Sequence, residues 1–372
     1  MQISQLSTAI PKNEYSTEEL QTRFPCQIPE GVKQNILNLG VSKRHLINHT
    51  QPQSKSETLL DETDLVNLCS EACWKAIKKA GLSIRDINFF VVAYDVNPIL
   101  CPGLSQRLIR EIGFSPYIKH INIKGMACGA LTSALRLAES HLATYPKDQV
   151  LICVSGVNSY WFYNQVQGIK DVMEIDKINL IRDARRRHAE LRKWIAAMEF
   201  FLFGDGVASA ITTKNGEGLS VKRIAEITNL NKKNHSAGYA RLAALNEPFK
   251  FGFYSHLDKE IPNLGIKYSS IALKKLVGKN AKTTIKTAKK WAIHTGSEKI
   301  LNAIARHYQI PLEKIKESHD ILREYGNLAG ASLPFILEKT VSENKLSKGD
   351  TVLMLGYGWG FSASTALLEF NK

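Results

Sequence analysis

One series of elements occurs twice in the chain, about 202 residues apart, and this repeat constrains the fold more than any other sequence feature. Three pairs of segments share the spacing: 89–94 with 291–296, 125–130 with 326–331, and 148–151 with 350–353. Their offsets are 202, 201 and 202 residues. A common offset over several elements indicates an internal duplication. We therefore expect two similar halves, with a boundary near residue 215.

The repeated elements predict an α/β fold. Segments 89–94 and 150–154 are continuous apolar runs, typical of strands that are buried on both faces of a sheet. Between them, residues 130–142 carry few charges, which predicts a helix buried on most of its surface. Further helices are expected at 103–112 and 298–308. The duplication then predicts two similar mixed sheets around central helices, one from residues 1–215 and one from residues 216–372.

Two irregular stretches lie between the repeated elements. Residues 171–198 have a helical pattern, and the apolar run that follows is interrupted by Gly204-Asp205-Gly206. Because such a triplet between apolar runs is a turn signal, we expect a β-hairpin there. Residues 214–246 are rich in glycine and asparagine and are expected to form short strands and loops.

Composition limits the classes of protein to consider. The chain has 372 residues, and its 49 Lys and Arg exceed its 35 Asp and Glu, so its surface should attract anions. We expect no membrane span, because no apolar run approaches about 20 residues. Residues 1–12 show no secretory signal, so a cytoplasmic protein is expected. Six cysteines without a CxxC pair predict neither a disulfide framework nor a zinc site, and we expect no bound metal or cofactor.

Cys128 is a candidate nucleophile. It lies between Gly125 and Gly129 at the predicted start of the buried helix. The positive end of a helix dipole and unpaired backbone N–H groups favour a thiolate and can bind an oxyanion. Cysteine is also a small hydrophobic residue that is often simply buried, so Cys128 alone does not decide between the two interpretations.

His294 and Asn327 are candidate partners of this cysteine. His294 follows the apolar strand at 291–293, at the sheet edge where α/β proteins build their sites. Asn327 begins the second-half counterpart of the Cys128 segment. Alone, each has an ordinary explanation, a buried core histidine and a helix N-cap. Because two-fold pseudosymmetry brings related helix starts together, we expect all three side chains to face one cavity.

Five segments together resemble the thiolase superfamily, in particular its ketoacyl synthase III and type III polyketide synthase (chalcone-synthase-like) branch. They are GMACGALTSAL at 125–135, FGDGVASA at 203–210, WAIHTGSEKIL at 291–301, REYGNLAGAS at 323–332 and GYGWGFSAS at 356–364. The resemblance spans nearly the whole chain and implies a five-layered αβαβα thiolase fold and a homodimer. The stretch at 252–257, followed by Ile261-Pro262, is similar to a polyketide-branch segment whose phenylalanine, here Phe253, lines the site entrance.

The resemblance also implies roles for individual residues. Cys128 would be acylated by a thioester, while His294 and Asn327 would hold the carbonyl of a malonyl thioester. Decarboxylation puts negative charge on that carbonyl oxygen, which N–H donors stabilise. The backbone of Cys128 and the loop Gly358-Trp359-Gly360 would bind the second oxyanion. Trp359 stands where polyketide synthases commonly carry proline. In this respect the loop is more similar to the ketoacyl synthase branch.

Candidate substrate contacts are less specific. Trp161 and Phe162 would line an acyl tunnel or simply pack in the core. Lys43 and Arg44 resemble a phosphate-contacting run of the family. Two basic clusters, within 182–193 and 274–290, are either solvated faces or surfaces for the phosphates of coenzyme A or an acidic acyl carrier protein.

We therefore expect a decarboxylative Claisen-condensing acyltransferase that uses coenzyme A or carrier-protein thioesters. Three alternatives stay open at this stage. The first is an acyltransferase that moves an acyl group from Cys128 to an alcohol or amine without decarboxylation. The second is a cysteine hydrolase, because Cys/His/Asn trios also serve proteolysis. The third is a basic scaffold for nucleic acid, which is disfavoured because no binding motif accompanies the charge.

Overall fold

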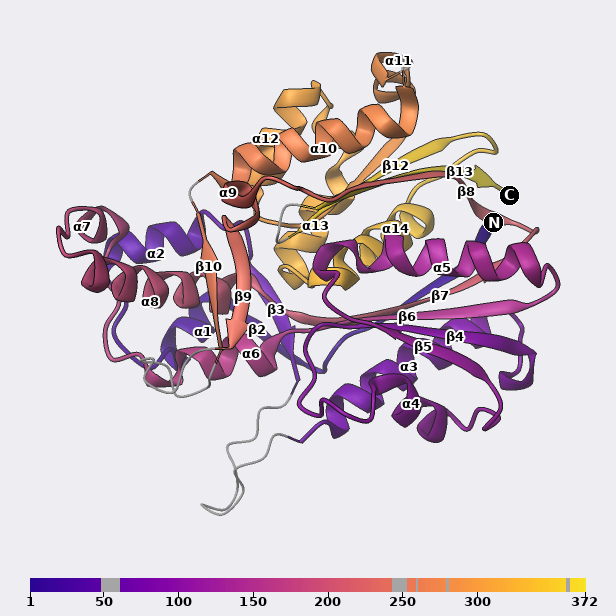
Figure 1. Cartoon of the computed structure of the whole chain (residues 1–372), viewed down its shortest axis with the longest axis horizontal. Coiled ribbons are helices and arrows are strands. Elements are labelled where there is room, and N and C mark those ends of the chain that lie inside the picture. The colour runs from indigo at the N-terminus through magenta and orange to yellow at the C-terminus, as the bar shows by residue number, and fades with distance from the viewer. Residues whose placement is uncertain (48–60, 243–252, 259, 279–280, 359–361) are drawn as a thin grey trace.

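The computed structural model describes residues 1–47, 61–242, 253–258, 260–278, 281–358 and 362–372. Its main feature is a nine-stranded mixed sheet with strand order β11-β12-β13-β8-β1-β7-β6-β4-β5 (Figure 1). The strands of the N-terminal half are β1 (Gln2–Ala9), β4 (Ile87–Ala93), β5 (Lys119–Ile123), β6 (Gln149–Val157) and β7 (Asp205–Thr213). Those of the C-terminal half are β8 (Gly218–Ile227), β11 (Lys290–Ile293), β12 (Thr351–Tyr357) and β13 (Ala363–Asn371).

Strand pairing follows the same pattern in both halves. The parallel pair β4–β6 corresponds to β11–β12, and the antiparallel pair β6–β7 corresponds to β12–β13. The antiparallel pair β1–β7 likewise corresponds to β8–β13. β5 extends the N-terminal part by one parallel strand. The two expected sheets are joined into one, because Gln2 and Ile3 of β1 pair with Ser220 and Leu219 of β8.

Helices complete five layers, as expected. α5 (Ala130–Thr144) and α14 (Ser332–Glu343) lie between the two parts of the sheet and share one buried apolar cluster with strands from both (Figure 1). α3 (Thr63–Lys79) and α4 (Leu104–Ile112) cover the outer face of the N-terminal strands. α10 (Ile261–Val277) and α12 (Glu298–Tyr308) cover that of the C-terminal strands.

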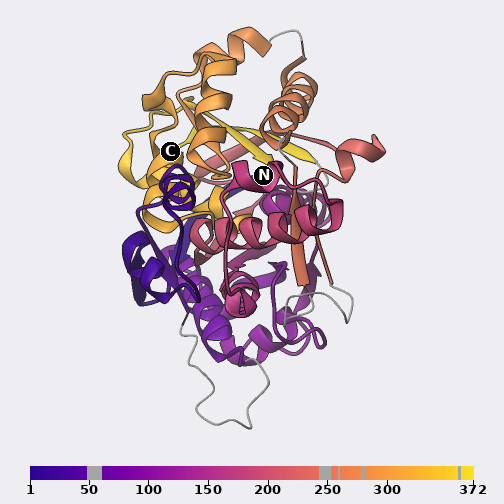
Figure 2. The ribbon, with the colours of Figure 1, turned by 90° about the vertical axis from the view of Figure 1, so that its left-hand side faces the viewer.

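A side lobe packs around α8 (Ala184–Leu202) and has its own apolar cluster (Figure 2). The helical pattern expected at 171–198 is confirmed by α7 (Ile175–Asn179) and α8. The other elements of this region are β2 (Asn13–Ser16), α1 (Thr17–Arg23), α2 (Glu30–Leu37), β3 (Lys43–Leu46), α6 (Ser159–Gln165), α9 (Lys232–His235), β9 (Gly238–Leu242) and β10 (Phe253–Leu257). α11 (Ala281–Thr287) and α13 (Lys316–Tyr325) belong to the C-terminal half.

The predicted hairpin at Gly204-Asp205-Gly206 is wrong. α8 continues to Leu202 and β7 begins at Asp205, so the turn joins a helix to a strand. An apolar run of this length does not distinguish a buried helix from a buried strand, which explains the error. The Asp205 carboxylate is buried and accepts hydrogen bonds from the backbone N–H groups of Ile47, Asn158 and Ser159. It therefore fixes the start of β7.

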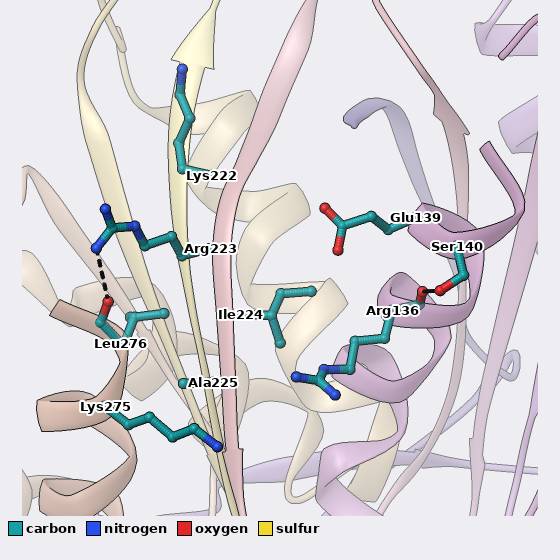
Figure 3. A pocket seen from close by; sticks show the side chains of 9 residues that line it. All are labelled: Arg136, Glu139, Ser140, Lys222, Arg223, Ile224, Ala225, Lys275 and Leu276. Carbon is teal, nitrogen blue, oxygen red and sulfur yellow. Dashed lines mark hydrogen bonds between the residues drawn. The ribbon is translucent and has the colours of Figure 1, made fainter. Parts of the chain in front are cut away.

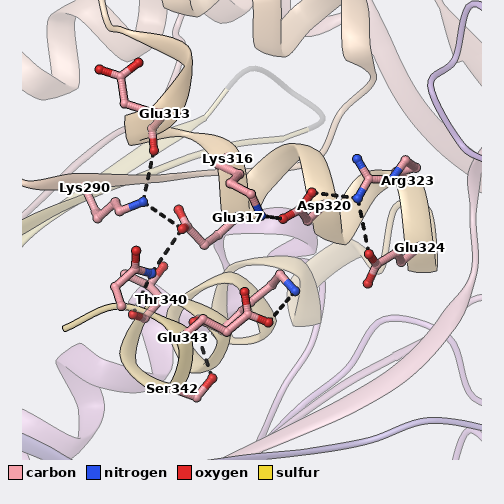
Figure 4. Close-up of polar contacts among 12 residues, drawn as sticks. Lys290, Glu313, Lys316, Glu317, Asp320, Arg323, Glu324, Thr340, Ser342 and Glu343 are labelled. Atoms are coloured by element: carbon pink, nitrogen blue, oxygen red, sulfur yellow. Dashed lines mark hydrogen bonds and ion pairs between the residues drawn. The ribbon is translucent and has the colours of Figure 1, made fainter. Parts of the chain in front are cut away.

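An ion pair attaches α13 to β11, the strand that precedes His294. The ammonium of Lys290 lies 2.7 Å from Oε1 of Glu317, whose residue is 2% exposed (Figure 4). The Asn344 amide donates to the same oxygen at 3.0 Å, and Lys290 also donates to the Glu313 carbonyl at 2.9 Å. Removing Lys290 would leave a buried charge unpaired, which typically costs about 3–5 kcal/mol. No helix in the described ranges is long and apolar enough to cross a membrane.

Candidate active site

Two short 3-10 turns form the framework of the site. The turn η2 (Ala127–Gly129) precedes α5, and η6 (Ala329–Ala331) precedes α14. Each begins with an alanine in the left-handed region, with φ of 43° at Ala127 and 46° at Ala329. That conformation is uncommon for residues other than glycine and often marks functional sites. The two turns pack together, and Gly330 lies so close to the Ala127 carbonyl that a Cβ there would be 3.0 Å from it.

Cys128 is the middle residue of η2 and is partly exposed. Its backbone N–H lies beside Gly358, where an added Cβ would be 3.6 Å from the Cys128 nitrogen. Burial of the sulfur raises the pKa of the thiol, and the Asp95 carboxylate raises it further. A hydrogen bond to the backbone of Cys128 lowers it by less. Desolvation therefore outweighs the helix-start effect expected from the sequence, and the resting group is a thiol.

His294 directly follows β11, and its backbone N–H donates to the Leu355 carbonyl at 2.9 Å. The residue is 2% exposed, and its Nδ1 has no hydrogen-bond partner among the described residues. Burial lowers the pKa of the imidazole to about 3. The ring is therefore neutral at physiological pH and presents one N–H donor and one acceptor nitrogen.

Asn327 is held by the turn that follows α8. Its N–H donates to the Leu202 carbonyl at 2.9 Å, and its carbonyl accepts from the Gly204 N–H at 3.2 Å. The side-chain Oδ1 accepts from the Ala329 N–H at 2.8 Å. Because Oδ1 is engaged in this way, the amide N–H groups are the part of the side chain left to donate to a ligand.

Hydrogen bonds and ring contacts link the elements that carry Cys128, His294 and Asn327. The Tyr357 hydroxyl donates to the His294 carbonyl at 3.0 Å, and the two rings meet edge to face at 5.4 Å. Burial raises the pKa of Tyr357, and the neighbouring Cys128 raises it further. On the other side, Thr295 donates to Ser332 at 2.7 Å, and Ser332 accepts from the Leu328 N–H at 3.0 Å. The three elements therefore meet in one region.

We compared the chain with known proteins. Residues 279–370 match the family described as 3-oxoacyl-[acyl-carrier-protein (ACP)] synthase III C terminal, a range that contains His294 and Asn327. A 3,5-dihydroxyphenylacetyl-CoA synthase of Amycolatopsis orientalis is 22% identical over 98% of this chain and 92% of its own. A β-ketoacyl-[acyl-carrier-protein] synthase III of Clostridium perfringens is 26% identical over 83% of this chain and 86% of its own.

A solved structure matches the whole fold. The 1,3,6,8-tetrahydroxynaphthalene synthase of Streptomyces coelicolor, a bacterial type III polyketide synthase, is similar over 100% of both chains, with a TM-score of 0.81 and 22% identity. Over nearly its whole length, the chain is therefore similar to type III polyketide synthases and to ketoacyl synthases III, and it has the fold of the former.

Of the other residues expected at this site, only some lie in the part of the chain that the structure describes. Gly358 lies beside Cys128, whereas Trp359 and Gly360 lie outside the described residues. Phe253 begins β10, and its side chain is also outside the part of the chain that the structure describes.

The aromatic residues expected to line an acyl tunnel, Trp161 and Phe162, lie on α6. Phe162 is 4% exposed and stacks on Phe203 with ring centres 4.2 Å apart. Trp161 is partly buried and packs against the apolar cluster under α3. Phe203 was not singled out from the sequence. Its backbone pairs with Asn327, and its position in FGDG is the signal that could have identified it.

The structure contradicts the expected phosphate contact of Arg44. Its side chain is completely buried, and its guanidinium donates to the Thr17 hydroxyl at 2.8 Å. Burial lowers the pKa of Arg44 to about 9. The strand is enclosed from Arg44 onward, because Arg44, His45 and Leu46 of β3 are all buried. Lys43 is half-buried and pairs with Glu14 at 2.8 Å.

A basic groove lies between α5, β8 and α10, away from the Cys128 turn (Figure 3). It is lined by Arg136, Glu139, Ser140, Lys222, Arg223, Ile224, Ala225, Lys275 and Leu276. Several of its cations already have partners. Arg136 pairs with Glu226 at 3.0 Å, and Lys275 donates to the Glu226 carbonyl at 3.3 Å. In the described residues, no group of three His, Cys, Asp or Glu side chains could hold a metal ion.

Proposed function

We propose that this protein joins an acyl group carried on Cys128 to a malonyl thioester by decarboxylative Claisen condensation. The observation that carries the proposal is that a neutral buried imidazole, His294, and a side-chain amide, Asn327, lie on segments linked to the Cys128 turn. Tyr357 of β12 links His294 to this turn, and the packing of η6 on η2 links Asn327 to it. Two uncharged N–H donors suit a developing enolate, because they stabilise its charge without protonating its carbon.

The first step is transfer of the acyl group. The sulfur of Cys128 attacks the carbonyl carbon of an acyl thioester, a new C–S bond forms, and the C–S bond to the donor breaks. The thiol proton ends on the departing thiol. Since burial raises the pKa of Cys128, deprotonation must accompany the attack. The tetrahedral oxyanion would be bound by the N–H of Cys128 and by the loop that begins at Gly358.

The second step forms the nucleophile for condensation. The bond between the malonyl carboxylate and the α-carbon breaks and releases carbon dioxide. Its electron pair delocalises onto the thioester oxygen, which accepts hydrogen bonds from His294 and Asn327. The α-carbon then attacks the acyl carbonyl on Cys128, a C–C bond forms, and the cysteine leaves as a thiolate that takes up a proton. The product is a β-ketoacyl thioester.

The low pKa of His294 disfavours the cysteine hydrolase alternative. A hydrolase needs a histidine that takes the proton of the nucleophile and holds it as an imidazolium. Burial opposes that charge and places the pKa of His294 at about 3.

Intact-mass spectrometry after incubation with acyl-CoAs tests the assignment. We expect one acyl adduct on the native protein and none on Cys128→Ala. Native protein that holds an acyl group should release carbon dioxide from malonyl-CoA and yield a β-ketoacyl product. Adduct formation without carbon dioxide release would instead support simple acyl transfer. An adduct that persists in Cys128→Ala would overturn the assigned nucleophile.

Further features of the proposal concern substrates and assembly. Coenzyme A or carrier-protein thioesters are the donors, and Lys43 is the remaining candidate contact for a donor phosphate. Phe253, Trp161 and Phe162 are proposed to border the acyl site. No other cofactor is required by these steps.

We also propose a cytoplasmic homodimer, with each chain divided into the halves 1–215 and 216–372. β5 lies at one edge of the sheet, and Lys119, His120 and Ile121 on it are exposed. An exposed edge strand of this kind can pair with a second copy. Sedimentation equilibrium tests the dimer.

A further inference from the structure

A carboxyl group that the catalytic steps above do not use is buried in the side lobe. Glu199 lies in the last turn of α8 and is 1% exposed. Among the described residues, no group reaches either side-chain oxygen with full hydrogen-bond geometry, and the polar group beside them is the Ser255 hydroxyl. Leaving a buried polar group without a partner costs about 1–3 kcal/mol. Such a cost is typical of a group that is retained for binding rather than for stability.

A second buried polar group lies beside it. Ser255 on β10 is also 1% exposed, and its hydroxyl has no partner with hydrogen-bond geometry among the described residues. Burial raises the pKa of Glu199 to about 8, and the nearby Ser255 hydroxyl offsets part of this rise. The two side chains are therefore close to each other. α8 packs directly against β10 (Figure 1). Both groups therefore lie in the seam between these two elements.

This seam is polar along its length. His188, Arg192 and Glu199 recur at spacings of four and seven residues, which places them on one face of α8. Facing them, His256 of β10 lies 6.3 Å from the His188 ring and 5.2 Å from the Tyr239 ring of β9. A row of polar groups between two packed elements is unusual for a core, where charged residues are seldom fully buried.

The seam leads to the proposed catalytic residues. The Phe203 N–H donates to the Glu199 carbonyl, so Glu199 lies one turn, about 6 Å of helix, before Phe203. The residues on either side of Phe203, Leu202 and Gly204, hydrogen-bond the backbone of Asn327. Glu199 therefore lies in the wall of α8 that continues directly into the turn holding Asn327.

We propose that Glu199 and Ser255 form the polar part of the acyl-chain site and bind an oxygen of the acyl chain carried on Cys128. This inference rests on the proposed function, since each condensation leaves a ketone oxygen on the β-carbon. A protonated carboxyl donates one O–H, and a serine hydroxyl donates another, which matches the two lone pairs of a ketone. Because burial keeps Glu199 protonated near neutral pH, a carbonyl is a better match than an ammonium group.

The test compares two starters that differ only at the β-carbon, acetoacetyl-CoA and butanoyl-CoA. The measured quantity is the ratio of the two kcat/KM values for acylation of Cys128, and acylation is monitored by mass spectrometry. The native protein should favour acetoacetyl-CoA, and Glu199→Leu should reduce that preference about tenfold, as expected for one lost hydrogen bond to a buried partner. Glu199→Gln keeps an N–H donor and should retain most of the preference, and Ser255→Ala should reduce it less than Glu199→Leu.

Glu190→Gln is the matched control, because Glu190 lies on the same helix and pairs with Lys193 at 3.1 Å. It should leave the ratio unchanged. If Glu199 had a purely structural role, Glu199→Gln would lower the melting temperature. We expect this substitution to raise it. An unchanged ratio in Glu199→Leu and Ser255→Ala, with normal Cys128 adducts, would overturn this proposal alone. Absence of any Cys128 adduct with either starter would overturn the proposed function together with it.

Discussion

The turns before α5 and α14 have the same backbone and different chemistry. Ala127 and Ala329 both have positive φ, at 43° and 46°, and Gly125 and Gly326 upstream of them have φ of 77° and 72°. In η2 this backbone presents the Cys128 thiol. In the second half, the corresponding backbone presents Asn327, two residues before Ala329. The backbone N–H of Ala329 donates to the side-chain Oδ1 of Asn327.

The difference between the turns indicates how a duplicated fold divides one reaction. The repeated backbone positions a functional residue near the start of each central helix, and the side chains then diverge. In the proposed mechanism, one half supplies the nucleophile and the other supplies a hydrogen-bond donor. The four predictions below test whether the two turns contribute in this separate way.

The largest effect is expected from Cys128→Ala. This change removes the only proposed attachment point, so acylation and condensation should fall below detection, while decarboxylation of malonyl-CoA continues because His294 and Asn327 remain. Mass spectrometry and carbon dioxide release measure the two activities on the same sample. If decarboxylation also vanished, the two turns would not act separately.

Asn327→Ala tests the second turn. Loss of one donor to an enolate oxygen should reduce malonyl decarboxylation by about 10²–10³-fold. Acylation of Cys128 should change little, because Asn327 takes no part in that step. Asn327→Asp should be at least as damaging, since a carboxylate repels the enolate. Equal losses in acylation and decarboxylation would contradict the division of roles.

The pH dependence of Cys128 alkylation should produce a smaller effect. Because burial raises the pKa of the thiol, the thiolate fraction should keep rising as pH increases from 7 to 9, by nearly tenfold per pH unit. Iodoacetamide labelling followed by mass spectrometry measures this rate at Cys128. A plateau below pH 8 would show a thiolate stabilised by the helix start, as the sequence alone suggested. His294 should add no titration in this range, since its pKa of about 3 leaves it neutral throughout.

The smallest effect is expected from glycine at the two strained alanines. Glycine adopts positive φ without steric cost, so Ala127→Gly and Ala329→Gly should each stabilise the fold by about 1 kcal/mol. Urea unfolding of both variants provides the comparison. Ala127→Gly should also slow acylation, because a freer backbone holds the neighbouring thiol less firmly. If neither variant gained stability, the strain in the two turns would be negligible.

Much of the fold was predictable from the sequence because the repeat is recorded in local patterns. The offsets of 201 and 202 residues identified β4 with β11 and β6 with β12, and the few charges in 130–142 predicted α5. The joining of the sheets through Gln2 and Ile3 was not predictable, because it depends on pairing between distant segments. The helix-to-strand turn at Asp205 was missed for a different reason, because a short apolar run does not distinguish a buried helix from a buried strand.

The candidate site divides similarly. Cys128, His294 and Asn327 could be proposed from the sequence because they lie at element ends with glycine nearby. Their protonation was not, because the pKa values of Cys128 and His294 depend on burial by groups from other segments. Arg44 and Glu199 show the same limit. Charged residues are expected at the surface, and only the tertiary structure reveals that these two are enclosed.

The hydrogen bonds on either side of Asn327 tie two distant parts of the chain together. Leu202 and Gly204, which hold its backbone, lie more than 120 residues before it in the sequence. The direction of the Asn327 amide is therefore set by the turn that follows α8 as well as by its own segment. A cut or insertion in that turn, far from Asn327 in sequence, would leave the amide without this support.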